Sequence, residues 1–234
     1  MLNHTKNSSA ERINHVIRRV IALTAVCLLG ACAAPQAPVA KAVYDLGLPA
    51  PRAPVSSASA VAPSANSMPA ASATTASLKS LSVLVLSDVT SPTALDSAAL
   101  VYRLAYTDVQ QLRAYSLARW SMPPAQLVQL RIRNTLGARG PVLGAADGVA
   151  PWRLQVELEE FSQVFESPER SAGVVRLRVT LLHKEQWVGQ QVFSASVSAT
   201  AQDAIGGVRA LAAATDDAVA QMDGWVAQQM QLPK

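Results

Sequence analysis

Thiol and imidazole side chains are scarce in this chain, which has two cysteines and three histidines among 234 residues. Only Cys32 and His183 lie beyond residue 31. One cysteine cannot form an intramolecular disulfide, and these two residues lack the further ligands of a typical zinc site. We therefore expect a fold that is held by its apolar core and that uses no metal or soluble cofactor.

The common catalytic motifs are also missing. The sequence has no Gly-x-Ser-x-Gly nucleophile elbow, no His-Glu-x-x-His helix and no glycine-rich phosphate loop. His183 is expected in a turn, where a lone histidine is usually solvated. Paired carboxylates of glycoside hydrolysis could be supplied by Glu157, Glu159, Glu160, Glu166 and Glu169, but the first two alternate with apolar residues, which indicates the solvated face of a strand. The sequence predicts a protein that is not an enzyme, with a glycan-active envelope enzyme as the weaker alternative.

The N-terminal residues follow the pattern of a bacterial export signal. Arg18 and Arg19 precede an apolar run at residues 20–29, which is about half the length that spans a bilayer. The run ends in Leu-Leu-Gly-Ala before Cys32, which resembles a lipobox, the motif whose cysteine is acylated and becomes the first mature residue. We predict a lipoprotein signal peptide at residues 1–31 and a lipid anchor on Cys32. Ala33 stands where aspartate would indicate inner-membrane retention, so we expect a periplasm-facing anchor in the outer membrane.

The basic charge of the chain belongs mostly to this leader. The leader carries four of the 20 basic residues and one of the 16 acidic residues, so 16 basic and 15 acidic side chains remain beyond it. A nearly neutral mature chain gives no argument for nucleic-acid binding.

Composition also divides the mature chain. We expect a lipidated tether at residues 32–42 and a short first strand at 43–48. Residues 49–79 are almost wholly Ala, Ser, Pro and Thr, a composition typical of disorder, and form either a linker or an insert within the domain. Residues 80–234 are long enough to form one folded domain.

Hydrophobic periodicity predicts a mixed α/β (α+β) layer fold, a mixed sheet flanked by helices. The expected strands cover residues 81–86, 100–106, 111–120, 152–159, 174–182 and 187–198, and the last three should form an antiparallel meander. Pro123 and Pro124 should open a helix that ends at Gly137. An apolar stripe predicts a long final helix at residues 202–230.

Arginines are concentrated in the middle of the chain. We identify Arg113, Arg119, Arg131 and Arg133 as candidate contacts for an acidic partner or a lipid head group. The alternative is that these arginines lie on solvated faces of the domain and contact no partner.

The same region resembles the ABC-type transport auxiliary lipoproteins, the PqiC-like (YmbA-like) family. The resemblance is carried by Tyr102-Arg103, by Leu112-Arg113-Ala114-Tyr115, and by Arg119-Trp120-Ser121-Met122-Pro123-Pro124-Ala125-Gln126-Leu127-Val128. It implies a fold similar to the amino-terminal domain of TolB, no enzymatic activity, and a mainly structural role for the matching motif residues: Tyr102, Tyr115, Trp120, Pro123 and Pro124.

The resemblance also implies a partner. Members of this family accompany MCE-domain proteins, which carry lipid between the inner and outer membranes. We therefore expect an outer-membrane docking subunit for a periplasmic MCE assembly, and a symmetric partner would favour a homo-oligomer of this chain. The alternative is a lipoprotein adaptor of another envelope machine, such as a secretion system or a cell-wall synthase.

Overall fold

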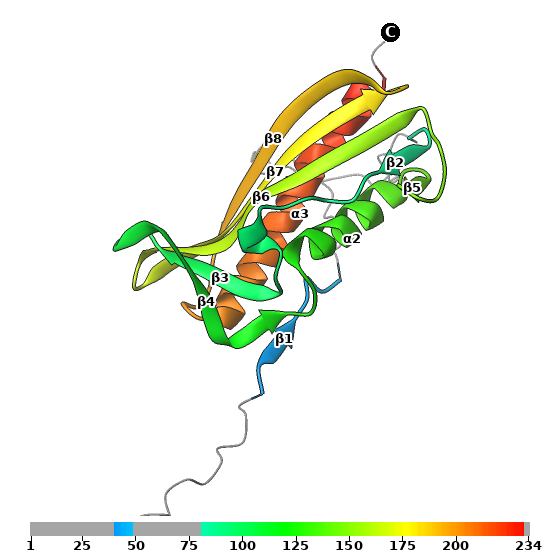
Figure 1. Ribbon diagram of the computed structural model, residues 1–234. Coiled ribbons are helices and arrows are strands. Elements are labelled where there is room, and N and C mark those ends of the chain that lie inside the picture. Colours follow the sequence, from blue (N-terminus) through cyan, green and yellow to red (C-terminus); the bar gives the residue numbers. More distant parts are fainter. Residues whose placement is uncertain (1–39, 49–80, 232–234) are drawn as a thin grey trace, which may run out of the picture. The chain divides into compact units, whose positions relative to one another are not determined.

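The computed structural model describes residues 40–48 and 81–231. The predicted leader, Cys32 and the segment at residues 49–79 lie outside the described residues. The described residues form a mixed eight-stranded sheet and two α-helices, which confirms the α+β class and the long C-terminal helix. Figure 1 shows how these elements are arranged. The elements are β1 (Ala42–Tyr44), β2 (Leu84–Leu86), the 3-10 helix η1 (Thr93–Leu95), β3 (Ala99–Leu104), β4 (Asp108–Trp120), α2 (Pro124–Gly137), β5 (Val142–Gly144), β6 (Trp152–Ser167), β7 (Arg170–His183), β8 (Gln186–Ser198) and α3 (Ala204–Gln229).

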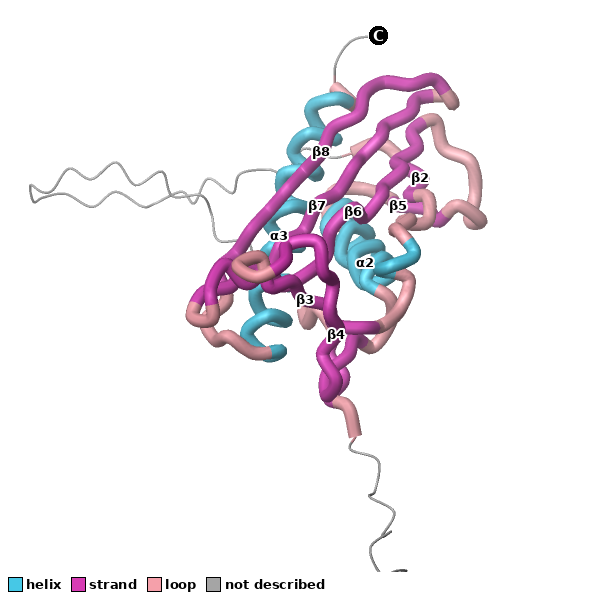
Figure 2. The backbone as a smooth tube through the Cα atoms, turned by 60° about the vertical axis from the view of Figure 1, so that its left-hand side comes forward, coloured by secondary structure: helices cyan, strands magenta, loops and turns pink. Residues whose placement is uncertain are grey.

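The expected meander of β6, β7 and β8 forms the longest part of the sheet, with antiparallel pairing throughout. The opposite edge of β6 holds two parallel neighbours, β2 near its start and β3 near its end. Beyond them, β5 pairs with β2 and β4 pairs with β3. The long strand β6 therefore joins the β2–β5 pair at its start and the β3–β4 pair at its end to the meander (Figure 2).

The short strand β1 belongs to this sheet. It pairs in parallel with the end of β4, in the register Ala42↔Ala118 and Tyr44↔Trp120. The strand ends earlier than the expected residue 48, because the Gly47 N–H donates to the Asp45 side chain at 2.7 Å and Gly47 adopts a φ of 64°. The residues between Leu48 and Leu81 therefore connect two strands of one sheet.

Both helices begin where their sequences favour it. Pro124 occupies the first turn of α2, where its missing N–H needs no partner, and Asp203 caps α3 by accepting a bond from the Gly206 N–H at 2.7 Å. Helix α3 packs on β6, β7 and β8, and α2 packs against α3. The largest fully buried side chains in the resulting core include Trp120, Phe161, Leu100, Ile132 and Leu211.

A glycine allows the close approach of α3 to the sheet. A Cβ atom at Gly173 of β7 would overlap the Leu211 backbone nitrogen and lie 2.5 Å from the Ala210 carbonyl carbon. Only a glycine at this position lets the helix backbone rest directly on the strand.

Further differences from the expected elements concern β6, β5 and η1. The strand β6 continues eight residues beyond the predicted end at 159, because a register shift between Leu158 and Glu160 interrupts the alternation on which the prediction depended. No strand was expected where β5 lies, and η1 was not expected. Each has three residues, which is too short to show a periodicity. No described helix combines the length and apolar character needed to cross a bilayer.

Candidate functional site

The four candidate arginines do not share one surface. Arg131 of α2 is buried, with 3% of its surface exposed. Its Nη1 lies 3.2 Å from the Asp216 carboxylate of α3, and its Nη2 donates to the Leu46 carbonyl oxygen at 2.6 Å. Arg131 therefore connects the segment that follows β1 to α2 and α3. Because it is buried, it cannot serve as the expected surface contact.

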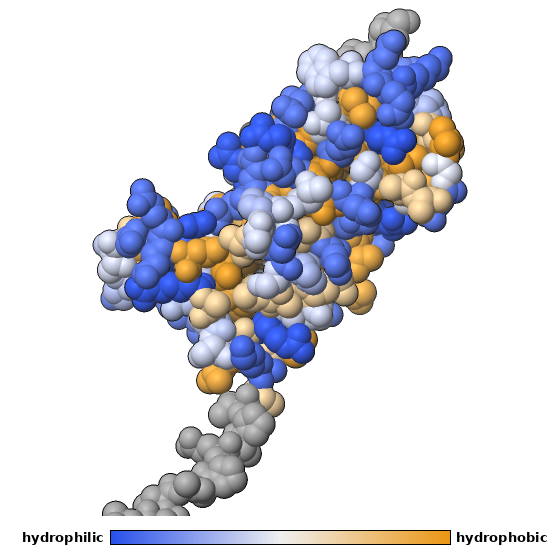
Figure 3. Space-filling view, in the orientation of Figure 1, coloured by the Kyte–Doolittle hydropathy of each residue, from blue (hydrophilic) through white to orange (hydrophobic). Residues whose placement is uncertain are grey.

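The other three candidates remain accessible. Arg113 and Arg119 are exposed on β4, and neither forms an ion pair within the described residues; Arg113 donates to the Gln111 side chain at 2.8 Å. Arg133 of α2 lies 4.0 Å from Asp147 and lines a hollow of about 790 Å³ beside Met122 and Leu130. Apolar residues on the visible side of the molecule form small patches separated by polar ones (Figure 3).

The motif residues surround the bend of β4 and the start of α2. Trp120 is fully buried, with its ring centroid 5.4 Å from that of Phe161. Pro123 caps α2 and Pro124 is buried in its first turn. These contacts give the motif a structural role at the point where β4 leads into the helix.

The two motif tyrosines pack against each other with tilted rings at the other end of this block. The Tyr102 and Tyr115 ring centroids are 4.7 Å apart, and the Tyr115 hydroxyl donates to Gln163 Oε1 at 2.8 Å. Gln163 is fully buried and donates in turn to Ser171 Oγ at 2.8 Å. Burial, with smaller effects of Tyr102 and Asp203, raises the pKa of Tyr115 from 10.0 to about 12. The hydroxyl is therefore a neutral donor at physiological pH.

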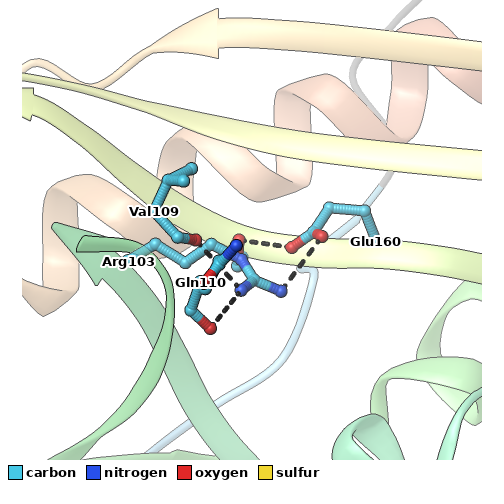
Figure 4. A network of polar contacts seen from close by, with 5 residues as sticks. Arg103, Val109, Gln110 and Glu160 are labelled. Atoms are coloured by element: carbon cyan, nitrogen blue, oxygen red, sulfur yellow. Dashed lines mark hydrogen bonds and ion pairs between the residues drawn. The ribbon is translucent and has the colours of Figure 1, made fainter. Parts of the chain in front are cut away.

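The acidic residues considered for glycan chemistry are held by arginines. Glu160 lies 3.3 Å from Arg103 of β3, whose other Nη donates to the Val109 and Gln110 carbonyl oxygens (Figure 4). Across the meander, Glu159 pairs with Arg176 at 2.8 Å and also with Arg178. Ion pairs between acidic residues of β6 and arginines of β7 are typical of the polar face of a sheet. They therefore favour the predicted solvated face for these carboxylates.

His183 lies at the end of β7, as expected, beside the turn residues Lys184 and Glu185, which have φ values of 51° and 62°. Its ring centroid lies 4.4 Å from that of Trp152. Within the described ranges, no group of three or more His, Cys, Asp or Glu side chains could hold a metal ion.

Two buried arginine side chains form ion pairs with aspartates of α3. These aspartates were not among the expected site residues. Asp216 pairs with Arg131, and Asp223 pairs with Arg139 at 2.9 Å, with 2% and 8% of the Asp223 and Arg139 side chains exposed. The sequence does contain a pattern that predicts such pairs. Two aspartates seven residues apart lie on one face of a helix that is otherwise apolar there, so each needs a buried cationic partner.

These features define a small α+β domain with a mixed sheet and a long C-terminal helix. The chain belongs to the family of ABC-type transport auxiliary lipoprotein components, whose family model matches residues 65–223. Membership implies membrane anchoring and a non-catalytic role as an auxiliary component of an ABC-type transport system.

Solved structures share the fold. A protein from Xanthomonas campestris assigned to the DUF330 family is 16% identical, with a TM-score of 0.58 over 63% of this chain and 85% of that one. An uncharacterized protein is 14% identical, with a TM-score of 0.54 over 80% of this chain and 99% of that one. No curated protein sequence shows a significant match to this chain.

Proposed function

We propose that this protein is a non-enzymatic docking subunit of an intermembrane lipid transport system. Its lipidated Cys32 anchors it in the outer membrane, and its domain binds the periplasmic end of an MCE-domain assembly, so that lipid passes across the joint. The family match over residues 65–223 is the observation that carries this proposal.

The way in which the chain enters the fold supports an anchoring role. Ala42, the first residue of β1, follows Cys32 by ten residues, and Arg131 holds the carbonyl oxygens of Leu46 and Gly47 at 2.6 and 3.1 Å. The proposed anchor is thus joined to the sheet and to both helices within 15 residues of Cys32, and a pull on the lipid would be transmitted to the core.

The accessible arginines supply the proposed charged contact. Arg113 and Arg119 lie on β4, the strand that also pairs with β1. Guanidinium groups without an ion-pair partner in the described residues can bind carboxylates of a partner protein or phosphates of lipid head groups.

Deletion of the gene tests the proposal. If the protein docks an MCE assembly, its loss should weaken the contact of that assembly with the outer membrane and slow the transfer of labelled lipid between the membranes. Restoring the wild-type chain should recover both. If lipid transfer and the outer-membrane contact are unchanged in the deletion strain, the proposal is wrong.

A further inference from the structure

Exposed apolar side chains gather beside β1, where the described chain begins. Val43 of β1, Leu117 of β4 and Ile205 at the start of α3 are 51%, 57% and 46% exposed. Val43 lies opposite Arg119 in the β1–β4 pair, and exposed and buried residues alternate from Leu117 to the end of β4. Leu117, Arg119 and Val43 therefore share one face of this pair. Leu117 and Ile205 line one hollow of about 340 Å³, so the three apolar residues border a single surface.

Three cationic side chains lie among these residues. Lys41 precedes Val43 by two residues, and Arg119 lies opposite Val43. Arg209 follows Ile205 by four residues, which places both on the same side of α3. Lys41, Arg119 and Arg209 are exposed, and none of them forms an ion pair within the described residues. We call these six residues the anchor-end patch: Lys41, Val43, Leu117, Arg119, Ile205 and Arg209.

Two aspartates border the anchor-end patch, and each accepts a local backbone hydrogen bond. Asp45 accepts from the Gly47 N–H, and Asp203, which lines the hollow, accepts from the Gly206 N–H as the cap of α3. Positive charge therefore exceeds negative charge on this surface. Exposed apolar side chains combined with an excess of cations are typical of surfaces that lie on a membrane, where apolar groups enter the head-group region and cations attract lipid phosphates.

We propose that the anchor-end patch binds the surface of the outer membrane. Val43, Leu117 and Ile205 enter the head-group region, and the three cations bind lipid phosphates. This inference deepens the proposed function and rests on it through the lipidation of Cys32. It also orients the domain. Figure 1 shows β1 and the β7–β8 turn at opposite ends of the domain, so the turn is directed away from the membrane that holds the anchor.

The length of chain before the patch favours a lipid surface. Ten residues run from Cys32 to Lys41, and a fully extended chain of that length spans at most about 35 Å. A lipid on Cys32 therefore keeps Lys41 within this distance of the bilayer. A short tether gives an effective concentration on the order of millimolar, at which even a weak contact made by a few residues is occupied.

Size and charge argue against a protein as the occupant of the patch. A stable protein interface takes about 20–30 residues from each partner, whereas the patch has six. A second copy of this chain, paired through its own patch, would bring Lys41, Arg119 and Arg209 against the same cations, and like charges in contact are unfavourable. Phosphate head groups supply the opposite charge to all three cations.

Fluorescence of the lipidated chain in vesicles tests the inference. Cys32 is the only cysteine beyond the leader and acylation blocks its thiol, so an introduced cysteine can be labelled alone. A polarity-sensitive fluorophore is attached at Leu117→Cys or at Ile205→Cys. The control position is Val149→Cys, because Val149 is 92% exposed and lies just before β6, at the end of the sheet that holds the β7–β8 turn. The vesicles contain phosphatidylethanolamine, phosphatidylglycerol and a nitroxide-labelled lipid that quenches fluorophores in the head-group region.

We expect the nitroxide lipid to quench the probes at 117 and 205 at least about twofold, and the probe at 149 much less. Equal quenching at all three positions, or no quenching at 117 and 205, would overturn the inference. A change in the emission of these two probes that appears only at high protein density on the vesicles would indicate a second copy and would also overturn it. Uptake of label by the wild-type chain would show that Cys32 is free and would remove the lipidation on which the inference rests.

Charge variants test the cations of the patch. Arg119→Gln with Arg209→Gln should lower the quenching of the probe at 117 at least about twofold. Lys184→Gln with Arg133→Gln removes the same charge at accessible positions outside the patch and should leave the quenching unchanged. Full quenching in the first variant, or an equal loss in both, would contradict the binding of lipid phosphates by the patch.

Failure of this inference is distinguishable from failure of the proposed function. If the probes at 117 and 205 are not quenched while the tagged wild-type chain still recovers an MCE-domain protein from envelopes, the inference is wrong and the proposed function stands. If both probes are quenched as expected and the tagged chain recovers a different envelope machine, the patch binds the membrane and the proposed function is wrong.

Discussion

Trp120 is fully buried, and its indole N–H has no hydrogen-bond partner within the described residues. Its value to the fold therefore lies in packing against Phe161 and its neighbours. Trp120→Ala should lower the free energy of unfolding by about 3–5 kcal/mol. Trp120→Phe should cost clearly less, because it keeps an aromatic ring and loses no hydrogen bond. Urea denaturation of both variants checks this. An equal loss for Phe and Ala would contradict the packing account.

The Arg139–Asp223 pair is a buried ion pair between the end of α2 and α3. Asp223→Ala would leave the Arg139 guanidinium buried without this carboxylate, and the loss expected for such a break is about 3–5 kcal/mol. The matched control is Glu166→Ala, which removes an ion pair to Arg170 between side chains that are 63% and 74% exposed, and should cost less than about 1 kcal/mol. Thermal unfolding of the two variants gives the comparison, and similar melting temperatures would contradict it.

Tyr115 should make the protein sensitive to alkali. Its pKa is raised to about 12 in the folded state against 10.0 in the unfolded chain, mainly because burial disfavours the phenolate. The unfolded state therefore releases this proton first as the pH rises. The resulting stability is fully present below pH 10 and is lost between pH 10 and about 12.

Denaturation midpoints measured from about pH 9 to pH 11.5 test this behaviour. In Tyr115→Phe the stability should fall less steeply with rising pH than in the wild-type chain. Tyr106→Phe, at a residue that is 46% exposed, should leave this pH dependence of stability unchanged. An unaltered alkaline loss in Tyr115→Phe would show that another group is responsible.

Among the elements, α3 depends on its contact with β7 at Gly173. Gly173→Ala should destabilise the protein by about 1–3 kcal/mol or more, because the added methyl group meets backbone atoms of Ala210 and Leu211 that cannot rotate away. Gly224→Ala is the contrasting change, since a Cβ there meets nothing within 4 Å and alanine favours a helix by about 0.5–1 kcal/mol. Chemical denaturation should give opposite signs. Destabilisation by both would contradict the described packing.

The long elements could be predicted closely from the sequence and the short strands only in part. Strands were expected at residues 43–48 and 81–86, where β1 and β2 lie, but none was expected at β5. The Pro123-Pro124 start, the Gly137 end and the apolar stripe of α3 are local signals, and each agrees with the structure within about two residues. The strands β1, β2 and β5 have three residues each and are defined by pairing with distant partners, such as Tyr44↔Trp120. A local pattern carries no information on such pairing.

The surface was harder to predict than the fold. Arg131 and Arg133 were both expected on the surface, yet one is buried against Asp216 and the other lies beside an open hollow. The difference depends on an aspartate 85 residues away in the chain. The similarity to the amino-terminal domain of TolB stays a prediction.

For the molecule as a whole, the prediction with the widest consequence is the lipid anchor on Cys32. Cys32→Ala should yield an unprocessed precursor or a soluble species, because lipid attachment to this cysteine is the proposed link to the membrane. Fractionation of cells followed by immunoblotting measures the distribution, with wild-type chain as the reference. Normal processing and full membrane retention of the variant would contradict the lipobox interpretation.

The most direct test of the docking role is affinity purification of the tagged protein from detergent-solubilised envelopes after brief crosslinking, with mass spectrometry of the proteins that follow it. We predict recovery of an MCE-domain protein of an ABC-type lipid transport system. Reproducible recovery of a secretion or cell-wall complex in its place would contradict the proposed function.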